Sequence, residues 1–343
     1  MYSESDIDGA VAAGVLSPQM AAAFRNYTAN ARSAPAVDEE HFKLLTGFND
    51  IFVAIALSLS LTAIAQIGAM VTPALGGAGV AVSAWLLAEY FTRRRRMALP
   101  SILLLLAFVG GVAATMIGAL VSLNPELPDR TDAFIGAGIA LVTAGAAWAH
   151  WRRFMVPITV AAGAMALVGV AIALTLAAVP AAKDAIYPIL LAAGVVVFAV
   201  AMGWDMSDKE RRTRRSDVAF WLHLAAAPLI AHPVFQMLGV FDQNVDAAKA
   251  AIVIGLYLVF AFVALAVDRR ALLVSSLVYV LYAMYALFQG AGAVELSASL
   301  TAFVIGSALL TLSVFWHQMR GAVVALLGGL KDRLPPVQTI VPA

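Results

Sequence analysis

The chain contains ten apolar segments, each close to the roughly 20 residues that a helix needs to cross about 30 Å of hydrocarbon. Hydrophobic residues make up 62% of the sequence and charged residues 13%, whereas soluble domains have roughly half and a quarter. The apolar surplus therefore has to face lipid. We predict an all-α membrane protein with spans at 48–70, 74–91, 99–121, 133–149, 155–179, 185–203, 217–240, 250–267, 271–289 and 297–315.

The distribution of positive charge predicts the orientation of these ten helices. With the N-terminus in the cytoplasm, only Arg130, Lys183 and Lys249 of the 22 Lys and Arg residues lie on the opposite side. Connections rich in Lys and Arg stay cytoplasmic. We therefore predict that both termini are cytoplasmic and that the protein is a multi-pass protein of the bacterial inner membrane.

Two polar parts flank the membrane domain, which we place at 48–316. Residues 1–47 contain two predicted short helices, separated at Gly14 and followed by a linker. They are either a small docking module or two helices that lie against the membrane domain. Residues 317–343 begin with a segment that is basic at both ends and too short to span, so we predict an interfacial helix and a tail.

The segment 216–240 carries two histidines, two prolines and a glutamine where lipid tolerates few of them. On an ideal helix, one face receives Trp221, Ala225, Pro228, His232, Gln236 and Gly239. His232 lies about 22 Å along the helix from Asp217, whereas His223 lies on the opposite face near the headgroups. His232 is either a substrate-binding or proton-titrating position, or a neutral histidine bonded to a neighbouring helix.

Two other helices carry polar stripes, so the candidate polar site is larger than one helix. It comprises His232, Gln236, Trp221, Asp50, Ser58, Thr62, Gln66, Tyr279 and Tyr282. The three stripes either surround one cavity or form three packing seams, because small hydroxyls at helical spacing also allow close helix packing. Asp50 has a further alternative, since it lies where it could cap the first spanning helix.

Other chemistry is poorly represented in the sequence. There is no cysteine, and no phosphate-binding glycine loop, His-Glu metal motif or nucleophile elbow is present. Glu89, Asp205 and Asp268 each stand near arginines at cytoplasmic helix ends, so we predict interfacial salt bridges for them. We predict no cofactor, metal or nucleic acid, and we expect anionic lipid at the cytoplasmic basic turns, including Arg93 to Arg96.

The leader resembles a known group of bacterial proteins. Residues Gly14-Val15-Leu16-Ser17-Pro18-Gln19, followed by an alanine-rich helix and a series of hydrophobic spans, are similar to the start of uncharacterised membrane proteins of the DUF2157 kind. That resemblance implies a polytopic membrane protein and no established activity. The layout of ten spans in two similar halves also resembles the drug/metabolite transporters, although they lack such a leader.

These observations leave two main hypotheses for function. The first is a small-solute permease with a polar site around His232 and Gln236. The second is a non-catalytic scaffold or regulatory subunit that docks a partner protein through its N-terminal helices. A permease requires a hydrated path to the helix at 217–240, whereas a scaffold requires an apolar docking surface. An enzyme is a distant third.

Overall fold

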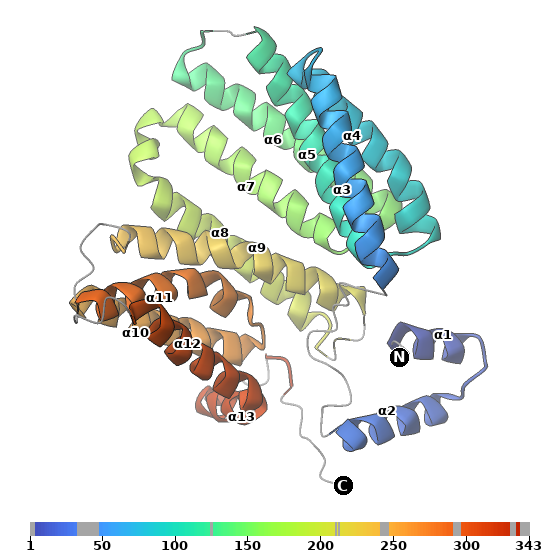
Figure 1. Cartoon of the computed structure of the whole chain (residues 1–343), viewed down its shortest axis with the longest axis vertical. Helices are drawn as coiled ribbons and strands as arrows, with labels where there is room; N and C mark the ends of the chain where they lie inside the picture. Colours follow the sequence, from blue (N-terminus) through green and yellow to red (C-terminus); the bar gives the residue numbers. More distant parts are fainter. Residues whose placement is uncertain are drawn as a thin grey trace.

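The structure is a computed structural model that describes residues 4–32, 48–123, 126–209, 211, 213–240, 247–290, 296–329 and 334–336. In these ranges the chain forms thirteen α-helices and no strand, which confirms the all-α class (Figure 1). Ten helices are long and apolar enough to cross a membrane. The protein is therefore a multi-pass integral membrane protein that lies in lipid.

The leader forms the two short helices that the sequence predicts. Helix α1 (Glu4–Ala12) ends before Gly14, which has a positive φ of 72°. Helix α2 (Pro18–Arg32) begins after Ser17, whose hydroxyl accepts a hydrogen bond of 3.1 Å from the amide of Met20. This bond is an N-cap, and it fixes the start of α2.

The ten spanning helices run close to their predicted positions. Their bounds are α3 (Phe48–Ala69), α4 (Pro73–Ala88), α5 (Ala98–Leu123), α6 (Asp129–Phe154), α7 (Ile158–Ala178), α8 (Ile186–Met206), α9 (Arg214–Met237), α10 (Ala247–Val267), α11 (Ala271–Gly290) and α12 (Ser297–Val314). A 3-10 turn, η2 (Pro180–Ala185), precedes α8, and a π-helical turn, η1 (Glu89–Arg94), extends α4. Helix α6 is longer than predicted because acidic residues in its first turn and basic residues in its last turn suit the helix dipole.

Helices α8 and α9 cross the middle of the molecule, between α3 to α7 on one side and α10 to α13 on the other (Figure 1). Helix α9 packs mainly against α7, α8 and α11, whereas α3 packs mainly against α4 and α5. Over half of the apolar window of α9 is buried inside the protein, the largest share of any span. The helix with the unusual histidines is therefore also the most enclosed one.

Glycines let several helices approach closely. A Cβ at Gly77 of α4 would lie 2.4 Å from the backbone nitrogen of Thr115 on α5, and a Cβ at Gly194 of α8 would lie 2.8 Å from the carbonyl carbon of Leu229 on α9. Both distances are shorter than a carbon atom tolerates. The α4–α5 and α8–α9 pairs therefore depend on the absence of a side chain at these positions.

Four connections lie at the same end of the bundle, because consecutive spanning helices run antiparallel. We call this the basic end; it comprises residues 93–97, 152–157, 207–213 and 268–270, which hold most of the arginines between spans. All four non-glycine residues with positive φ among the described residues lie here: Arg96, Met155, Arg211 and Asp268. Each reverses the chain in a conformation that costs an L-residue free energy.

The C-terminal helix α13 (Trp316–Leu326) follows α12 after one residue and packs against α10. Its buried residues are Trp316, Arg320 and Val324. The interfacial helix predicted to begin at 317 is thus a helix, and one of its faces is covered by the rest of the protein.

Candidate functional site

His232 and Tyr279, two of the residues predicted for the polar site, are in direct contact. The imidazole Nδ1 of His232 on α9 lies 2.7 Å from the hydroxyl of Tyr279 on α11. The Tyr187 ring of α8 approaches His232 edge-on, with ring centroids 6.1 Å apart, and Phe235 stacks on Tyr279 at 4.4 Å. Three helices therefore converge on the half-buried His232, and Tyr279 is buried.

The other predicted residues of α9 and α11 lie farther from this pair. Gln236 and Tyr282 are half-buried, and Tyr282 packs against the apolar core that α9 and α11 share. Trp221 is eleven residues before His232, or about 16 Å along the helix. Its ring packs near the basic end against the cores formed with α5 and α7.

The polar stripe of α3 lies elsewhere. Ser58, Thr62 and Gln66 are exposed on the outer surface of α3, and the Ser58 hydroxyl donates to the carbonyl oxygen of Ala54 at 2.8 Å. Asp50 is buried near the start of the same helix. Because α3 packs mainly on α4 and α5, the structure does not bring this stripe to His232.

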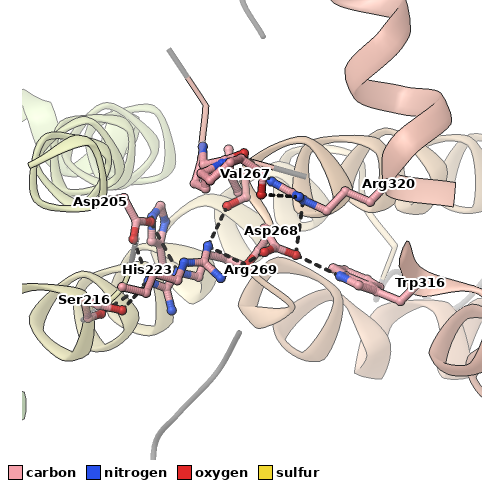
Figure 2. Close-up of polar contacts among 11 residues, drawn as sticks. Asp205, Ser216, His223, Val267, Asp268, Arg269, Trp316 and Arg320 are labelled. Atoms are coloured by element: carbon pink, nitrogen blue, oxygen red, sulfur yellow. Dashed lines mark hydrogen bonds and ion pairs between the residues drawn. The ribbon is translucent and has the colours of Figure 1, made fainter. Parts of the chain in front are cut away.

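A buried ionic network lies at the basic end, and its residues were not among those predicted for the candidate polar site. Asp205 of α8 pairs with Arg269 at 2.5 Å and lies 2.8 Å from Nε2 of His223 on α9. Arg269 also donates to the carbonyl oxygen of Ser216 at 3.2 Å. Asp205 is 1% exposed and His223 and Arg269 are each 2% exposed, so this part of the network joins α8, α9 and the α10–α11 turn away from solvent (Figure 2).

Asp268 forms the second part of the network, next to Arg269 in the chain. Its carboxylate accepts from Arg211 at 2.9 Å and from the Trp316 indole at 2.9 Å, and it lies 3.3 Å from Nε of Arg320. Arg320 further donates to the carbonyl oxygens of Pro335 at 2.6 Å and Pro336 at 3.1 Å. Figure 2 shows Trp316 and Arg320 of α13 both reaching Asp268, so α13 is tied to the turn between α10 and α11.

The ion pairs predicted for Asp205 and Asp268 form, but both carboxylates are buried. His223 is buried and bonded to Asp205. Its distance along α9 predicted a place near the headgroups, and the network does lie at the basic end, but that distance did not show that α8 and the α10–α11 turn cover the side chain. The useful signal was the run Asp268-Arg269-Arg270 between two apolar helices, because a turn so short holds its charges against the bundle.

Buried ions need partners, and the network supplies them. Separating a buried carboxylate from its partner costs several kcal/mol, about 3–5 by measurement in other proteins. Each carboxylate therefore holds its neighbouring elements together at the basic end.

The other half of the bundle holds a histidine of a different kind. His150 of α6 is fully buried, and its Nδ1 lies 3.3 Å from the hydroxyl of Thr159 on α7. Three aromatic rings surround it, those of Trp85, Phe108 and Phe154. No carboxylate approaches it among the described residues, so this histidine serves as part of an aromatic core.

Among the residues that the structure describes, no group of three His, Asp or Glu side chains has the geometry to hold a metal ion. Comparison with protein-family models, curated proteins and solved structures finds no match for this chain. The resemblance of the leader to proteins of the DUF2157 kind therefore stays a prediction.

Proposed function

We propose that the protein is a permease of the bacterial inner membrane that moves a small solute along α9, with both termini in the cytoplasm. One observation carries the proposal: α9, the most enclosed span, holds two histidines that pair with polar groups of other helices at two depths. Nine residues, or about 13 Å, separate them along the helix axis. Polar pairs inside a bilayer are expensive, and they commonly belong to substrate or proton pathways.

The contact between His232 and Tyr279 supports a role for a proton. Neutral imidazole can accept the hydroxyl proton of Tyr279 at Nδ1, whereas imidazolium can only donate there. Protonation would therefore reverse or break the contact between α9 and α11. A solute that binds better to one of the two arrangements would couple its own movement to that of the proton.

The prolines of α9 provide acceptors for a solute in the same region. Pro228 and Pro233 lie inside the helix and have no N–H, so the carbonyl oxygens of Leu224 and Leu229 lose their usual helical donor. Such carbonyl oxygens can bind a polar solute inside a membrane protein. At the basic end, the pairs formed by Asp205 and Asp268 would have to rearrange for the solute to leave.

A flux measurement tests this function. Purified protein is reconstituted into vesicles that enclose the pH-sensitive dye pyranine, and amino acids, sugars, nucleosides and organic cations are added outside in turn. We expect at least one solute to change the internal pH, and we expect His232→Ala to abolish that change. Tyr279→Phe keeps the ring but removes the hydroxyl, so it should shift the pH dependence of the flux.

The control variant is Thr143→Val in α6, which also removes a helix hydroxyl, one that donates to the carbonyl oxygen of Ile139 at 2.8 Å. It should transport as the unaltered protein does. The proposal fails if no solute in the panel moves protons, or if His232→Ala transports with an unchanged rate and pH profile.

A second candidate function is a membrane scaffold or regulatory subunit, which the surface of the leader favours. Val15, in the connection between α1 and α2, is 76% exposed, and on α2 Tyr27 is 73% exposed and Met20 and Phe24 are also exposed. Because the chain has no cysteine, Met20→Cys provides a single attachment point for a crosslinker. Crosslinking to one protein species in native membranes, together with absent flux, would favour this function over transport.

Anionic lipid is proposed as a partner in either case. The arginines of the basic end lie where a cytoplasmic leaflet would present its headgroups, and each such charge contributes about 1 kcal/mol to the attraction.

A further inference from the structure

A cavity of about 660 Å³ opens at the basic end, where α9 meets the start of α5 and the α6–α7 turn. It lies between η1, the start of α5, the α6–α7 turn and the first two turns of α9. Its polar lining residues are Thr92, Arg93, Arg96, Ser101, Arg153, Arg214 and Asp217. Four arginines from three separate parts of the chain therefore face one carboxylate, which leaves the cavity strongly positive.

Two of these arginines are held in place by a carboxylate outside the lining. Glu89 accepts from Arg153 at 2.6 Å and 2.9 Å, and from Arg93 at 3.3 Å. These bonds connect η1 to the end of α6, sixty-four residues later in the chain. The ion pairs fix the guanidinium groups at the rim, and each keeps N–H donors that Glu89 does not use.

The charges of the other two arginines, Arg96 and Arg214, are not neutralised in this way. Among the described residues no carboxylate pairs with Arg96 or Arg214. Arg96 occupies a left-handed conformation with φ of 53°, which turns the chain at the cavity wall. A guanidinium presents a planar fork of donors that matches a phosphate group in shape and charge.

An unsatisfied hydroxyl in the wall provides an independent observation. Thr92 is 8% exposed, and its Oγ1 is buried with no hydrogen-bond partner among the described residues. Buried hydroxyls nearly always have a partner, and those that lack one call for an explanation. Thr92 lines the cavity, and its hydroxyl is covered by protein in this conformation; rotation of the side chain would bring the hydroxyl to an oxygen of a bound ligand.

The remaining lining is apolar and includes Met97, Ile102, Phe154, Val156 and Ile158. The cavity has cationic and apolar walls and lies at the end of the spanning helices. It therefore suits a ligand with an anionic group at one end and a hydrocarbon part at the other. Basic pockets between spanning helices on the cytoplasmic side bind lipid headgroups in this manner.

We infer that this cavity is a binding site for a phosphate-bearing anion, held by Arg96, Arg214 and the Thr92 hydroxyl. An anionic lipid headgroup and soluble phosphate both present this chemistry. The inference rests on the proposed attraction of the basic turns for anionic lipid and narrows it to one site. It does not depend on transport, because binding is measured without flux.

Native mass spectrometry of the protein in detergent provides the test. The probes are phosphatidic acid, phosphatidylglycerol and, as a zwitterionic comparison, phosphatidylcholine, each titrated separately, with inorganic phosphate in a fourth titration. We expect a tightly held anionic lipid that Arg96→Gln/Arg214→Gln binds about tenfold or more weakly, because two charge-assisted contacts are lost. Phosphatidylcholine should bind weakly to both proteins.

The matched control is Arg94→Gln/Arg152→Gln, which removes the same amount of charge from the basic end but outside the cavity lining. It should retain the lipid with an affinity within about threefold of the unaltered protein, because the site itself is intact. Equal loss in both double variants would overturn the cavity as the site, while leaving diffuse attraction to anionic lipid in place.

Thr92→Val separates binding from folding. Without a ligand the hydroxyl is unpaired, so valine should leave the thermal unfolding midpoint of the lipid-free protein unchanged or raised. With lipid it should weaken retention several-fold. If inorganic phosphate binds and the anionic lipids do not, the ligand is soluble phosphate. If none of the anionic probes binds, the inference is overturned.

Discussion

Helices α3 to α7 and helices α8 to α12 bring their members together with different residues. In the first group, glycines let backbones touch, as Gly77 does against Thr115, and the buried His150 is enclosed by aromatic rings. In the second group, the close approach at Gly194 is joined by buried charges and by two histidines that bond to other helices. Closely packed apolar side chains fit together in one arrangement. Ion pairs and histidine hydrogen bonds, by contrast, can exchange partners when a proton or a ligand binds.

This difference assigns distinct roles to the two groups. The first behaves as a packed frame, and the second carries the polar groups that a transport cycle would use. Helix α9 joins them because it packs against α7 on one side and against α8 and α11 on the other. The following predictions test the contrast, starting with the largest expected effect.

Asp205→Asn should destabilise the protein most. The substitution preserves shape but leaves the buried guanidinium of Arg269 without its anion, at a cost of about 3–5 kcal/mol. Thermal unfolding in detergent measures the loss. Glu89→Gln in the first group is the comparison: its ion pair with Arg153 is partly exposed, so the cost should stay below about 1 kcal/mol. Equal losses would remove the contrast between the two groups.

Trp316→Phe should have the next largest effect. Phenylalanine keeps an aromatic ring, although a smaller one than the indole, and the hydrogen bond of 2.9 Å from the indole to Asp268 is lost; a bond to a buried charge contributes about 1.5–3 kcal/mol. Trp148→Phe provides a control, because Trp148 is exposed on α6 and its contact with Arg152 is a cation–π interaction. If both variants unfold at the same temperature, the indole does not stabilise the network.

Gly77→Ala should weaken the first group. The added Cβ would lie 2.4 Å from the backbone of α5, and forcing the helices apart costs about 1–3 kcal/mol. Gly110→Ala on α5 is the matched change, since nothing lies within 4 Å of its added Cβ. This substitution should leave the free energy of unfolding unchanged or raise it by up to about 1 kcal/mol, because alanine has a better helix propensity than glycine. If the two variants unfold at the same temperature, α4 and α5 are not tightly packed.

Thr62→Val should have the smallest effect. Thr62 is exposed on α3, away from α9, so the free energy of unfolding should change by less than about 0.5 kcal/mol. Solute flux should also be unchanged. A large loss of flux in this variant would mean that the stripe of α3 belongs to the transport path after all, and the division between the two groups would be wrong.

The number, class and approximate positions of the spanning helices followed from the sequence, because hydrocarbon thickness fixes the length of an apolar helix. Helical spacing also placed His232 on a polar face of α9, and it left open whether this histidine binds a solute or a neighbouring helix. Its partner, Tyr279, was among the candidate residues because it lies on a polar face of its own helix. For α9 and α11, periodicity therefore identified residues that face each other.

Periodicity did not identify which helices meet. The stripe with Ser58 and Gln66 has the same spacing as a buried polar face, but these residues are exposed on α3. For His223, the position along α9 gave the depth but not the burial, because α8 and the α10–α11 turn cover the side chain. Both outcomes depend on contacts between segments far apart in the chain, which the local pattern of a single sequence does not encode.

The most direct test of the central claim asks whether water reaches the interior of the second group. Ser276 on α11 is fully buried on the face that also carries Tyr279, and Ser276→Cys is a conservative change in a chain without cysteine. Its labelling by a charged maleimide is measured in vesicles. Leu296→Cys, at an exposed position, is the positive control, and Ala84→Cys in the core of the first group is the negative control.

A transport cycle that opens along α9 predicts that Ser276→Cys is labelled slowly, that a transported solute changes the rate, and that Ala84→Cys stays unlabelled. If Ser276→Cys resists labelling as fully as Ala84→Cys while Leu296→Cys reacts, the second group is as closed as the first and the permease proposal is contradicted.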